Sequence, residues 1–383
     1  MAAKKLFIQV SSAVFNALYS LFDGKTRRNE ALFVSRQTNV PPDDFVAVGE
    51  ELRAKGWTPR YHTRKLSKRT ALRYVVHVVQ EIYYLSRCRI CFLDRYDPVV
   101  SLIDFTYEEN ADNSAVHSEY PAIPVVIQMW HAFGSFKCFG YQSLDTQEGH
   151  SAQTAELFNI HRNYSWILCT GKDDCKVYAE AFGYPEDRVL PLGRPEFDTL
   201  LNLSGRQSND VFDGGKQTVL FAPTLRKSKE SEHPFYGLRE KLGDGCSSAR
   251  FVWSFHPLEL HRQAPAAVSS DLLCADIVVT DYSSIVYEAA LLKKRVLFYV
   301  PDIEEYRKSP GLNSDPQILA PKITFTSRES LVGYLSGLIS GSVEYDQTDF
   351  DAFIGETFSS CRPGVACRVA EFALAQAETH LNF

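Results

Sequence analysis

The chain has 383 residues, 45% of them hydrophobic and 23% charged, which excludes wholesale disorder and predicts two domains with separate cores. Its net charge of -6 argues against a general nucleic-acid-binding protein, which carries a strong basic excess, so we expect no nucleic-acid partner. The nine cysteines are scattered, several of them in apolar strand-like runs, which favours free thiols in a reducing cytoplasm over a disulfide framework.

The N-terminal segment raises the question of a membrane. Lys4 and Lys5 precede a mostly apolar stretch from Leu6 to Phe22, which is too short and too polar to predict a membrane-spanning helix. It also lacks the small-residue cleavage site of a secretory signal. We expect an amphipathic helix within residues 1–28, lying on a membrane or packed on the protein. The locally basic segment 53–89, with its tyrosine-rich helical run, indicates contact with anionic lipid or, alternatively, a solvated helix face.

Apolar β-branched runs alternate with helical patterns along the rest of the chain, which predicts parallel, doubly wound sheets. The first set of predicted strands is 31–35, 58–61, 90–93, 125–128, 164–170 and 188–192, with helices at 45–55, 67–87 and 172–182. The second set of predicted strands is 218–222, 250–255, 277–280 and 295–300.

This pattern predicts an α/β, GT-B-like fold, in which two Rossmann-type domains face a central cleft and ligands lie at the carboxyl ends of the strands. The polar, glycine-rich segment between the two sets has the composition of a linker. The predicted boundaries are 1–28 for the N-terminal helix, 29–201 for the first domain, 202–217 for the linker, 218–365 for the second domain and 366–383 for a C-terminal helix that could pack back on the first domain.

The segment from Asp276 to Leu292 carries the clearest chemical signal. A buried strand ends at Asp281-Tyr-Ser-Ser, and a helical pattern begins at Ile285. Ser283 and Ser284 would therefore lie at a helix N-terminus, where hydroxyls, unpaired backbone N–H groups and the helix dipole bind phosphate without a metal ion. The alternative is that one of these serines is only an N-cap.

Other polar residues follow neighbouring strands. His131 follows the strand at 125–128 and can take a proton from an alcohol near neutral pH, although a lone histidine is also a common structural residue. Thr224 and Arg226 follow the strand at 218–222, and His256 follows the strand at 250–255. Arginine, histidine and a hydroxyl-capped helix at strand ends of one sheet are the groups that a diphosphate-containing donor requires.

Glu288, one helical turn beyond Ser284, could accept ribose hydroxyls or could be an ordinary solvated helix residue. The sequence has no Walker A motif and no HExxH. We count neither the late Asp349-Phe-Asp351 nor the lone Cys88-Arg-Ile-Cys91 as a metal site. The prediction is therefore an enzyme with no cofactor and no metal ion.

Taken together, these motifs resemble the CDP-glycerol glycerophosphotransferases of bacterial teichoic acid and capsule synthesis, most closely the glycerol-phosphate primases. The segments that carry the resemblance occur in the family's order and are 130–140, 193–198, 222–226, 256–257, 280–284 and 291–306. The resemblance implies a metal-independent transferase, peripheral to the cytoplasmic face of the bacterial membrane. Its donor would be CDP-glycerol or a related CDP-polyol, and its acceptor an undecaprenyl-diphosphate-linked saccharide.

The resemblance also assigns roles to residues. His131 would be the general base on the acceptor hydroxyl and His256 a second catalytic group, while Arg226, Ser283, Ser284 and Thr224 would hold the donor phosphates. The remaining assignments are Asp281 and Glu288 for the nucleotide and its ribose, and Trp130, Gly134, Ser135 and Lys137 for the acceptor side. Three alternatives stay open: a CDP-ribitol-dependent transferase, a GT-B glycosyltransferase that uses a nucleotide sugar, and a membrane-bound scaffold without catalysis. The oligomeric state is not predicted.

Overall fold

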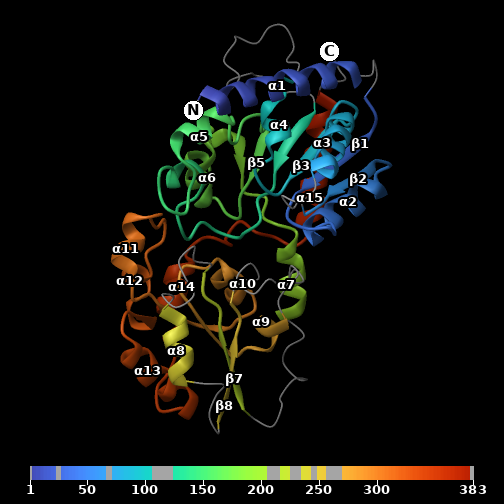
Figure 1. Cartoon of the computed structure of the whole chain (residues 1–383). Helices are drawn as coiled ribbons and strands as arrows, with labels where there is room; N and C mark the ends of the chain where they lie inside the picture. The colour runs from blue at the N-terminus through green and yellow to red at the C-terminus, as the bar shows by residue number, and fades with distance from the viewer. Residues whose placement is uncertain are drawn as a thin grey trace. The chain divides into compact units, whose positions relative to one another are not determined.

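The computed structural model describes residues 2–22, 27–65, 71–105, 124–204, 216–224, 234–242, 248–255 and 270–379. The chain divides into two compact units, shown in Figure 1. The first unit comprises Met1–His131, His150–Pro195 and Ser360–Phe383, and the second comprises Ala132–Gly149 and Glu196–Ser359. The predicted alternation of helices and strands is confirmed in both units.

The first unit is built on a six-stranded, all-parallel sheet with the order β2-β1-β3-β4-β5-β6. Its strands are β1 (Glu30–Ser35), β2 (Thr58–Thr63), β3 (Ile90–Leu93), β4 (Val125–Gln128), β5 (Trp166–Leu168) and β6 (Val189–Leu190). Its helices are α1 (Ala2–Phe22), α2 (Asp43–Ala54), α3 (Ala71–Leu85), α4 (Pro98–Leu102), α5 (Ala152–Leu157), α6 (Asp174–Phe182), the 3-10 turn η2 (Glu186–Arg188) and α15 (Val365–Thr379).

The second unit has a five-stranded, all-parallel sheet with the order β11-β10-β9-β7-β8. Its strands are β7 (Gln217–Phe221), β8 (Ala249–Trp253), β9 (Ile277–Thr280), β10 (Arg295–Tyr299) and β11 (Thr324–Phe325). Its helices are η1 (Gly140–Ser143), α7 (Glu196–Ser204), α8 (Pro234–Leu242), α9 (Ser270–Cys274), α10 (Ile285–Leu291), α11 (Ile303–Lys308), α12 (Pro316–Leu319), η4 (Pro321–Ile323), α13 (Arg328–Ser340) and α14 (Gln347–Ile354).

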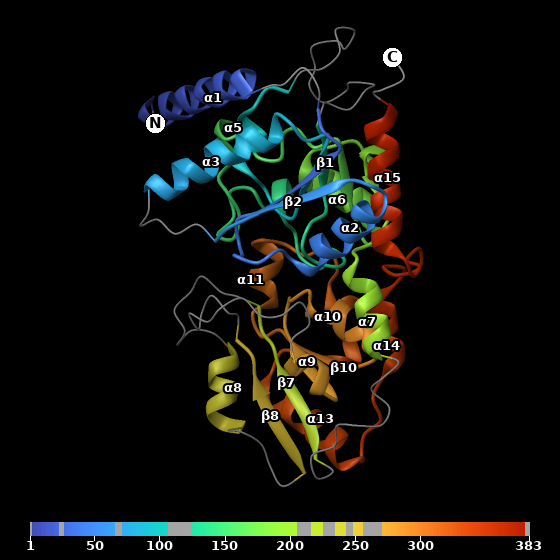
Figure 2. The ribbon, with the colours of Figure 1, turned by 90° about the vertical axis from the view of Figure 1, so that its right-hand side faces the viewer.

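The core of each unit lies on its sheet. Every residue of β1, β3, β4 and β9 is buried, as expected for parallel strands covered by helices on both faces. In the first unit, Figure 2 shows α1 and α3 on one side of the sheet and α2 and α15 on the other. The Phe33 ring of β1 packs 4.7 Å from Phe92 of β3 and 5.2 Å from Phe45 of α2. Each such buried ring contributes roughly 1.5–3 kcal/mol.

The two sheets share one connectivity that fixes where ligands bind. In each, the first strand lies between the second and the third, so the chain reverses direction across the sheet between β1 and β3 and again between β7 and β9. Ligands of open α/β sheets bind outside the carboxyl ends of the strands at such a switch point. Residues that follow β1 and β3 in one unit, and β7 and β9 in the other, are therefore placed for function.

The N-terminal helix α1 packs on the first unit through a mixed face, which buries Ile8 and Tyr19 and also carries Ser12 and Asn16. Ser12 Oγ donates to the Leu102 carbonyl at 2.8 Å, and Asn16 Oδ1 accepts from the Asp104 N–H at 2.7 Å. On the opposite face, five large apolar side chains are exposed, namely Leu6, Phe7, Val10, Val14 and Leu21. Lys4, Lys5, Gln9 and Ser20 of the same helix are exposed too. Contrary to the expectation that this stretch is too short and too polar, residues 3–22 are long and apolar enough to cross a membrane by length and composition alone, and 11% of the tested window is buried in the protein.

The compact units differ from the predicted boundaries at three segments: residues 132–149 and 196–201 belong to the second unit, and residues 360–365 to the first. Residues 132–149 belong to the second unit, because Lys137 bridges to Leu312 and the Gly134 backbone packs on the Tyr287 ring. The C-terminal helix α15 belongs to the first unit, where it packs on α2 and β4. In the predicted linker 202–217, α7 ends at Ser204, and residues 205–215 lie outside the described residues.

Candidate functional site

In the first unit, a tight turn after β4 positions His131. The buried Gln128 side chain ties this turn to the loop after β3: its Oε1 accepts from the Trp130 N–H at 3.0 Å and its Nε2 donates to the Arg95 carbonyl at 3.1 Å. Trp130 has a φ of 58°, a left-handed conformation that costs a bulky residue roughly 1–2 kcal/mol. The Trp130 ring packs 4.2 Å from the His131 ring, so the indole helps to orient the imidazole.

The hydrogen bond of His131 determines its tautomer. Nδ1 lies 3.2 Å from the Asp94 carbonyl oxygen, which can only accept, so Nδ1 carries the proton. In the neutral ring, Nε2 then has the lone pair that a general base needs. Asp94 follows β3, and its buried carboxylate accepts from Ser35 Oγ of β1 at 2.8 Å. His131 is therefore tied to the switch point between β1 and β3. Burial raises the pKa of Asp94.

A buried charge cluster lies at the same edge of the sheet. Arg36, which follows β1, pairs with Asp97 (Nε–Oδ2 2.5 Å) and with Glu81 (Nη2–Oε2 3.1 Å). Burial raises the pKa of Glu81 well above its usual range. Burial alone would also raise the pKa of Asp97. The net shift of this pKa is nevertheless downward, because the carboxylate is stabilised by Arg36, by Glu81 and by the N–H groups of Val99 and Val100, which it caps.

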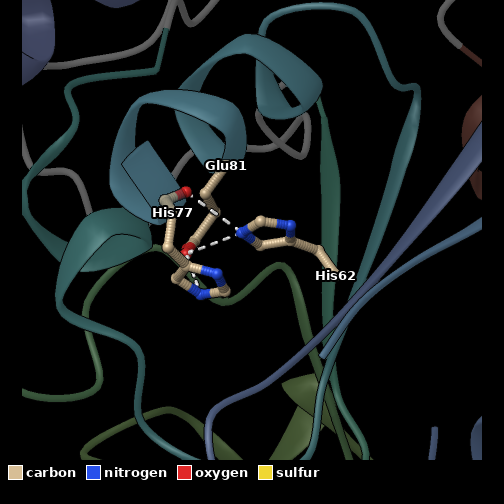
Figure 3. A group of neighbouring side chains, drawn as sticks. All are labelled: His62, His77 and Glu81. Atoms are coloured by element: carbon tan, nitrogen blue, oxygen red, sulfur yellow. Dashed lines mark hydrogen bonds and ion pairs between the residues drawn. The ribbon is translucent and has the colours of Figure 1, made fainter. Parts of the chain in front are cut away.

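Two histidines lie beside Glu81 of this cluster, and Figure 3 shows the three residues together. His62 is the next-to-last residue of β2, and His77 lies on α3, one turn before Glu81. Their rings stack with centroids 3.8 Å apart, and burial lowers the pKa of His62 to about 4 and that of His77 to about 3. Sequence reasoning missed this cluster. The spacing of His77 and Glu81 within a predicted helix was the available signal.

In the second unit, Asp281 ties together the ends of β7 and β9. Its Oδ1 accepts from the N–H groups of Thr224 and Tyr282, both at 2.7 Å, and the residue is fully buried. Thr224 thus lies at the switch point, as expected from its place after β7. These contacts fix the backbone where β7 and β9 end. The nucleotide-binding role of Asp281 stays a prediction.

The predicted helix N-terminus after β9 is confirmed as α10, a helix of seven residues. Ser283 Oγ accepts from the Ile285 N–H at 3.4 Å, so Ser283 has the contact of a capping residue. Ser284 occupies the N-cap position without a side-chain capping bond, and both serines are half-buried. Glu288 is also half-buried on α10. The predictions for Arg226 and His256 fall outside the described residues.

The predicted acceptor-side residues are divided between the units. Trp130 belongs to the first unit with His131, whereas Gly134, Ser135 and Lys137 belong to the second. Gly134 has a φ of 57°, and the Ser135 N–H donates to the Tyr287 hydroxyl of α10 at 3.3 Å. The Lys137 carbonyl accepts from Asn313 Nδ2 at 3.2 Å. The Gly-Ser turn therefore packs on the same helix that begins after Ser284.

Comparisons with known proteins show what the chain is similar to. The family model described as CDP-Glycerol:Poly(glycerophosphate) glycerophosphotransferase matches residues 17–369. The chain is 27% identical to the teichoic acid ribitol-phosphate polymerase TarL of Staphylococcus aureus, covering 78% of this chain but only 54% of TarL. It is 27% identical to a teichoic acid ribitol-phosphate primase of Bacillus spizizenii, over 80% of this chain and 82% of that protein. It is 22% identical to the teichoic acid glycerol-phosphate primase of Bacillus subtilis, over 67% of each.

The solved structure of the wall teichoic acid polymerase TagF superposes with a TM-score of 0.67 at 17% sequence identity, covering all of both chains. At that identity the likeness establishes the fold, which confirms the predicted GT-B-like architecture. The chain spans about half the length of several polymerases that it matches.

Proposed function

The chain belongs to the CDP-glycerol:poly(glycerophosphate) glycerophosphotransferase family, and we propose that it transfers a polyol phosphate from a CDP-linked donor to a lipid-linked saccharide, with release of CMP. The observation that carries the proposal is the geometry of His131. A histidine held at a strand end by a left-handed turn, with Nδ1 committed to the Asp94 carbonyl, has the tautomer of a general base for an alcohol.

In the proposed reaction, His131 Nε2 takes the proton of an acceptor hydroxyl. The acceptor oxygen attacks the phosphorus that bears the polyol, the bond from that phosphorus to the oxygen of CMP breaks, and CMP leaves with the electron pair. We assign the donor phosphates to Thr224, Arg226, Ser283 and Ser284, and charge neutralisation of departing CMP to Arg226 and His256. The proposal requires neither a metal ion nor a cofactor.

The donor is CDP-glycerol or CDP-ribitol. The description of the family favours glycerol, whereas the relatives with 27% identity are ribitol-phosphate enzymes. TagF, whose structure was also solved after soaking an H444N variant with CDPG, supports a CDP-polyol in this fold. A donor screen tests the proposal: CMP release from each CDP-polyol is measured with and without an undecaprenyl-diphosphate-linked disaccharide. Acceptor-dependent CMP from one donor is expected. Product formed only from UDP- or GDP-sugars would refute the proposed reaction.

We also propose that α1 holds the protein at an anionic membrane surface, on the cytoplasmic face where lipid-linked acceptors are made. The outer face of the helix exposes five large apolar side chains, with Lys4 and Lys5 exposed near its start, a combination that suits contact with anionic lipid. Phe7 is 68% exposed on that outer face. Leu72, Val75 and Val76 of α3, which packs against α1, are exposed as well.

Flotation with vesicles containing phosphatidylglycerol tests this surface. Wild-type protein should float, and Phe7→Glu should reduce the floating fraction, because a carboxylate on the apolar face opposes insertion near anionic headgroups. Val40→Glu is the matched control: Val40 is 70% exposed on a loop after β1. Equal flotation of all three proteins would contradict membrane contact through α1.

A further inference from the structure

The cluster in Figure 3 has the donors of a metal site. His62, His77 and Glu81 each offer a ligand atom, and these atoms all lie within 4.8 Å of one another. The Nε2 atoms of His62 and His77 lie 3.9 Å and 3.7 Å from the same carboxylate oxygen, Glu81 Oε2. In a tetrahedral zinc site with ligand bonds near 2.0–2.1 Å, neighbouring ligand atoms lie roughly 3.4 Å apart, so small rotations of the side chains would close the site.

The elements that carry these residues impose the geometry. His77 and Glu81 are four residues apart on α3, which puts both on one face of the helix. His62 lies near the end of the strand β2, and its side chain faces that pair. All three residues are buried, with exposed fractions of 7%, 2% and 0%. Such a site would be closed to substrate.

A further observation points to a ligand. Within the described residues, His77 Nε2 is buried and has no hydrogen-bond partner, and it lies 3.7 Å from Glu81 Oε2 inside the group of three. A buried nitrogen without a partner is rare in proteins, and a bound metal ion would satisfy it.

We propose that His62, His77 and Glu81 bind one divalent first-row transition metal ion, such as Zn²⁺, that fastens β2 to α3. Two imidazoles and one carboxylate suit Zn²⁺ or Co²⁺, whereas Mg²⁺ and Ca²⁺ prefer oxygen ligands throughout. Water would complete the coordination, because Asp97 is engaged with Arg36 and with the start of α4. His62 Nε2 now lies 3.1 Å from the His77 carbonyl. Metal binding would end that contact at little cost, since this carbonyl also accepts within α3.

The metal content of the full-length protein tests the proposal without any activity assay. Protein expressed in zinc-supplemented medium should carry a single equivalent of Zn²⁺ by mass spectrometry, and metal-stripped protein should give the visible absorption of tetrahedral Co²⁺ on titration. Glu81→Gln, which keeps shape and volume, should weaken Co²⁺ binding at least about a hundredfold, since loss of even an outer-shell partner costs 10–100-fold.

His77→Gln should behave like Glu81→Gln, whereas His150→Gln, at an exposed histidine elsewhere on the first unit, should bind as wild type does. Circular dichroism checks that each variant is folded. Wild-type protein that holds no Zn²⁺ and gives no tetrahedral Co²⁺ spectrum would overturn the proposal. Glu81 would then be protonated, and Arg36 would neutralise the single carboxylate of Asp97. Equal Co²⁺ affinity of wild type and both cluster variants would overturn it too.

Discussion

Replacement of Gly134 by alanine tests how the Gly-Ser turn is packed on α10. An added Cβ would lie 2.5 Å from Cε1 and Cε2 of Tyr287 and closer still to Cζ, well inside van der Waals contact. Tyr287 is only 2% exposed, so its ring has little room to move. The φ of 57° adds a second cost, because alanine resists the left-handed region.

The two costs can be separated within the same unit. Overpacking costs about 1–3 kcal/mol and left-handed strain about 1 kcal/mol, so Gly134→Ala should lower the free energy of unfolding by about 3 kcal/mol. Gly341→Ala meets no atom within 4 Å but has a φ of 74°, so it should lose only about 1 kcal/mol. Gly333→Ala, also without a neighbour within 4 Å and inside helix α13, should gain roughly 0.5–1 kcal/mol.

Urea unfolding followed by circular dichroism measures all three variants in the transition of the second unit, to which the three glycines belong. The expected order of midpoints is Gly333→Ala, wild type, Gly341→Ala and then Gly134→Ala. If Gly134→Ala and Gly341→Ala lost the same stability, the packing of the turn against Tyr287 would be wrong.

Two further predictions concern the first unit. Gln128→Leu should lower the turnover of CMP release at least about tenfold with little change in donor KM, because the turn before His131 loses its hydrogen bond to Gln128 and its tie to the Arg95 carbonyl. An unchanged turnover would show that the turn does not need Gln128. Burial lowers the pKa of His161 from 6.5 to about 3. Below pH 6.5 the unfolded chain therefore takes up a proton at His161 that the native protein does not, so the free energy of unfolding falls as the pH falls from 6.5 toward 3. His161→Asn, which suits the φ of 67°, should flatten that decline by up to about 1.4 kcal/mol per pH unit in urea unfolding between pH 6.5 and 4.5; parallel wild-type and variant curves would contradict it.

The parts of the site that the sequence predicted are those that follow from strand order. Apolar runs located β4 and β9, and in parallel sheets the next polar residues, His131 and Ser283, must lie at the carboxyl edge. The same reasoning placed Thr224 after β7. The end of a strand and the type of the residue that follows it depend on neighbouring residues in the chain, so both can be predicted from one sequence.

What could not be predicted depends on contacts between distant residues. The tautomer of His131 is determined by the carbonyl of Asp94, 37 residues away. The membership of Gly134 in the second unit depends on the bridge from Lys137 to Leu312. His62 meets Glu81 only because β2 runs beside β1 at the edge of the sheet, which no local pattern encodes. The inward position of Ser12 on α1 likewise depends on the carbonyl of Leu102, 90 residues away.

The central claim is that His131 activates the acceptor hydroxyl, and the most direct test is acceptor-dependent CMP release by His131→Gln beside wild type, with the preferred CDP-polyol and the lipid-linked disaccharide. Turnover should fall at least about a hundredfold, the usual contribution of a general base, while calorimetric affinity for the donor stays within about twofold. A folded His131→Gln protein that released CMP at the wild-type rate would contradict the account.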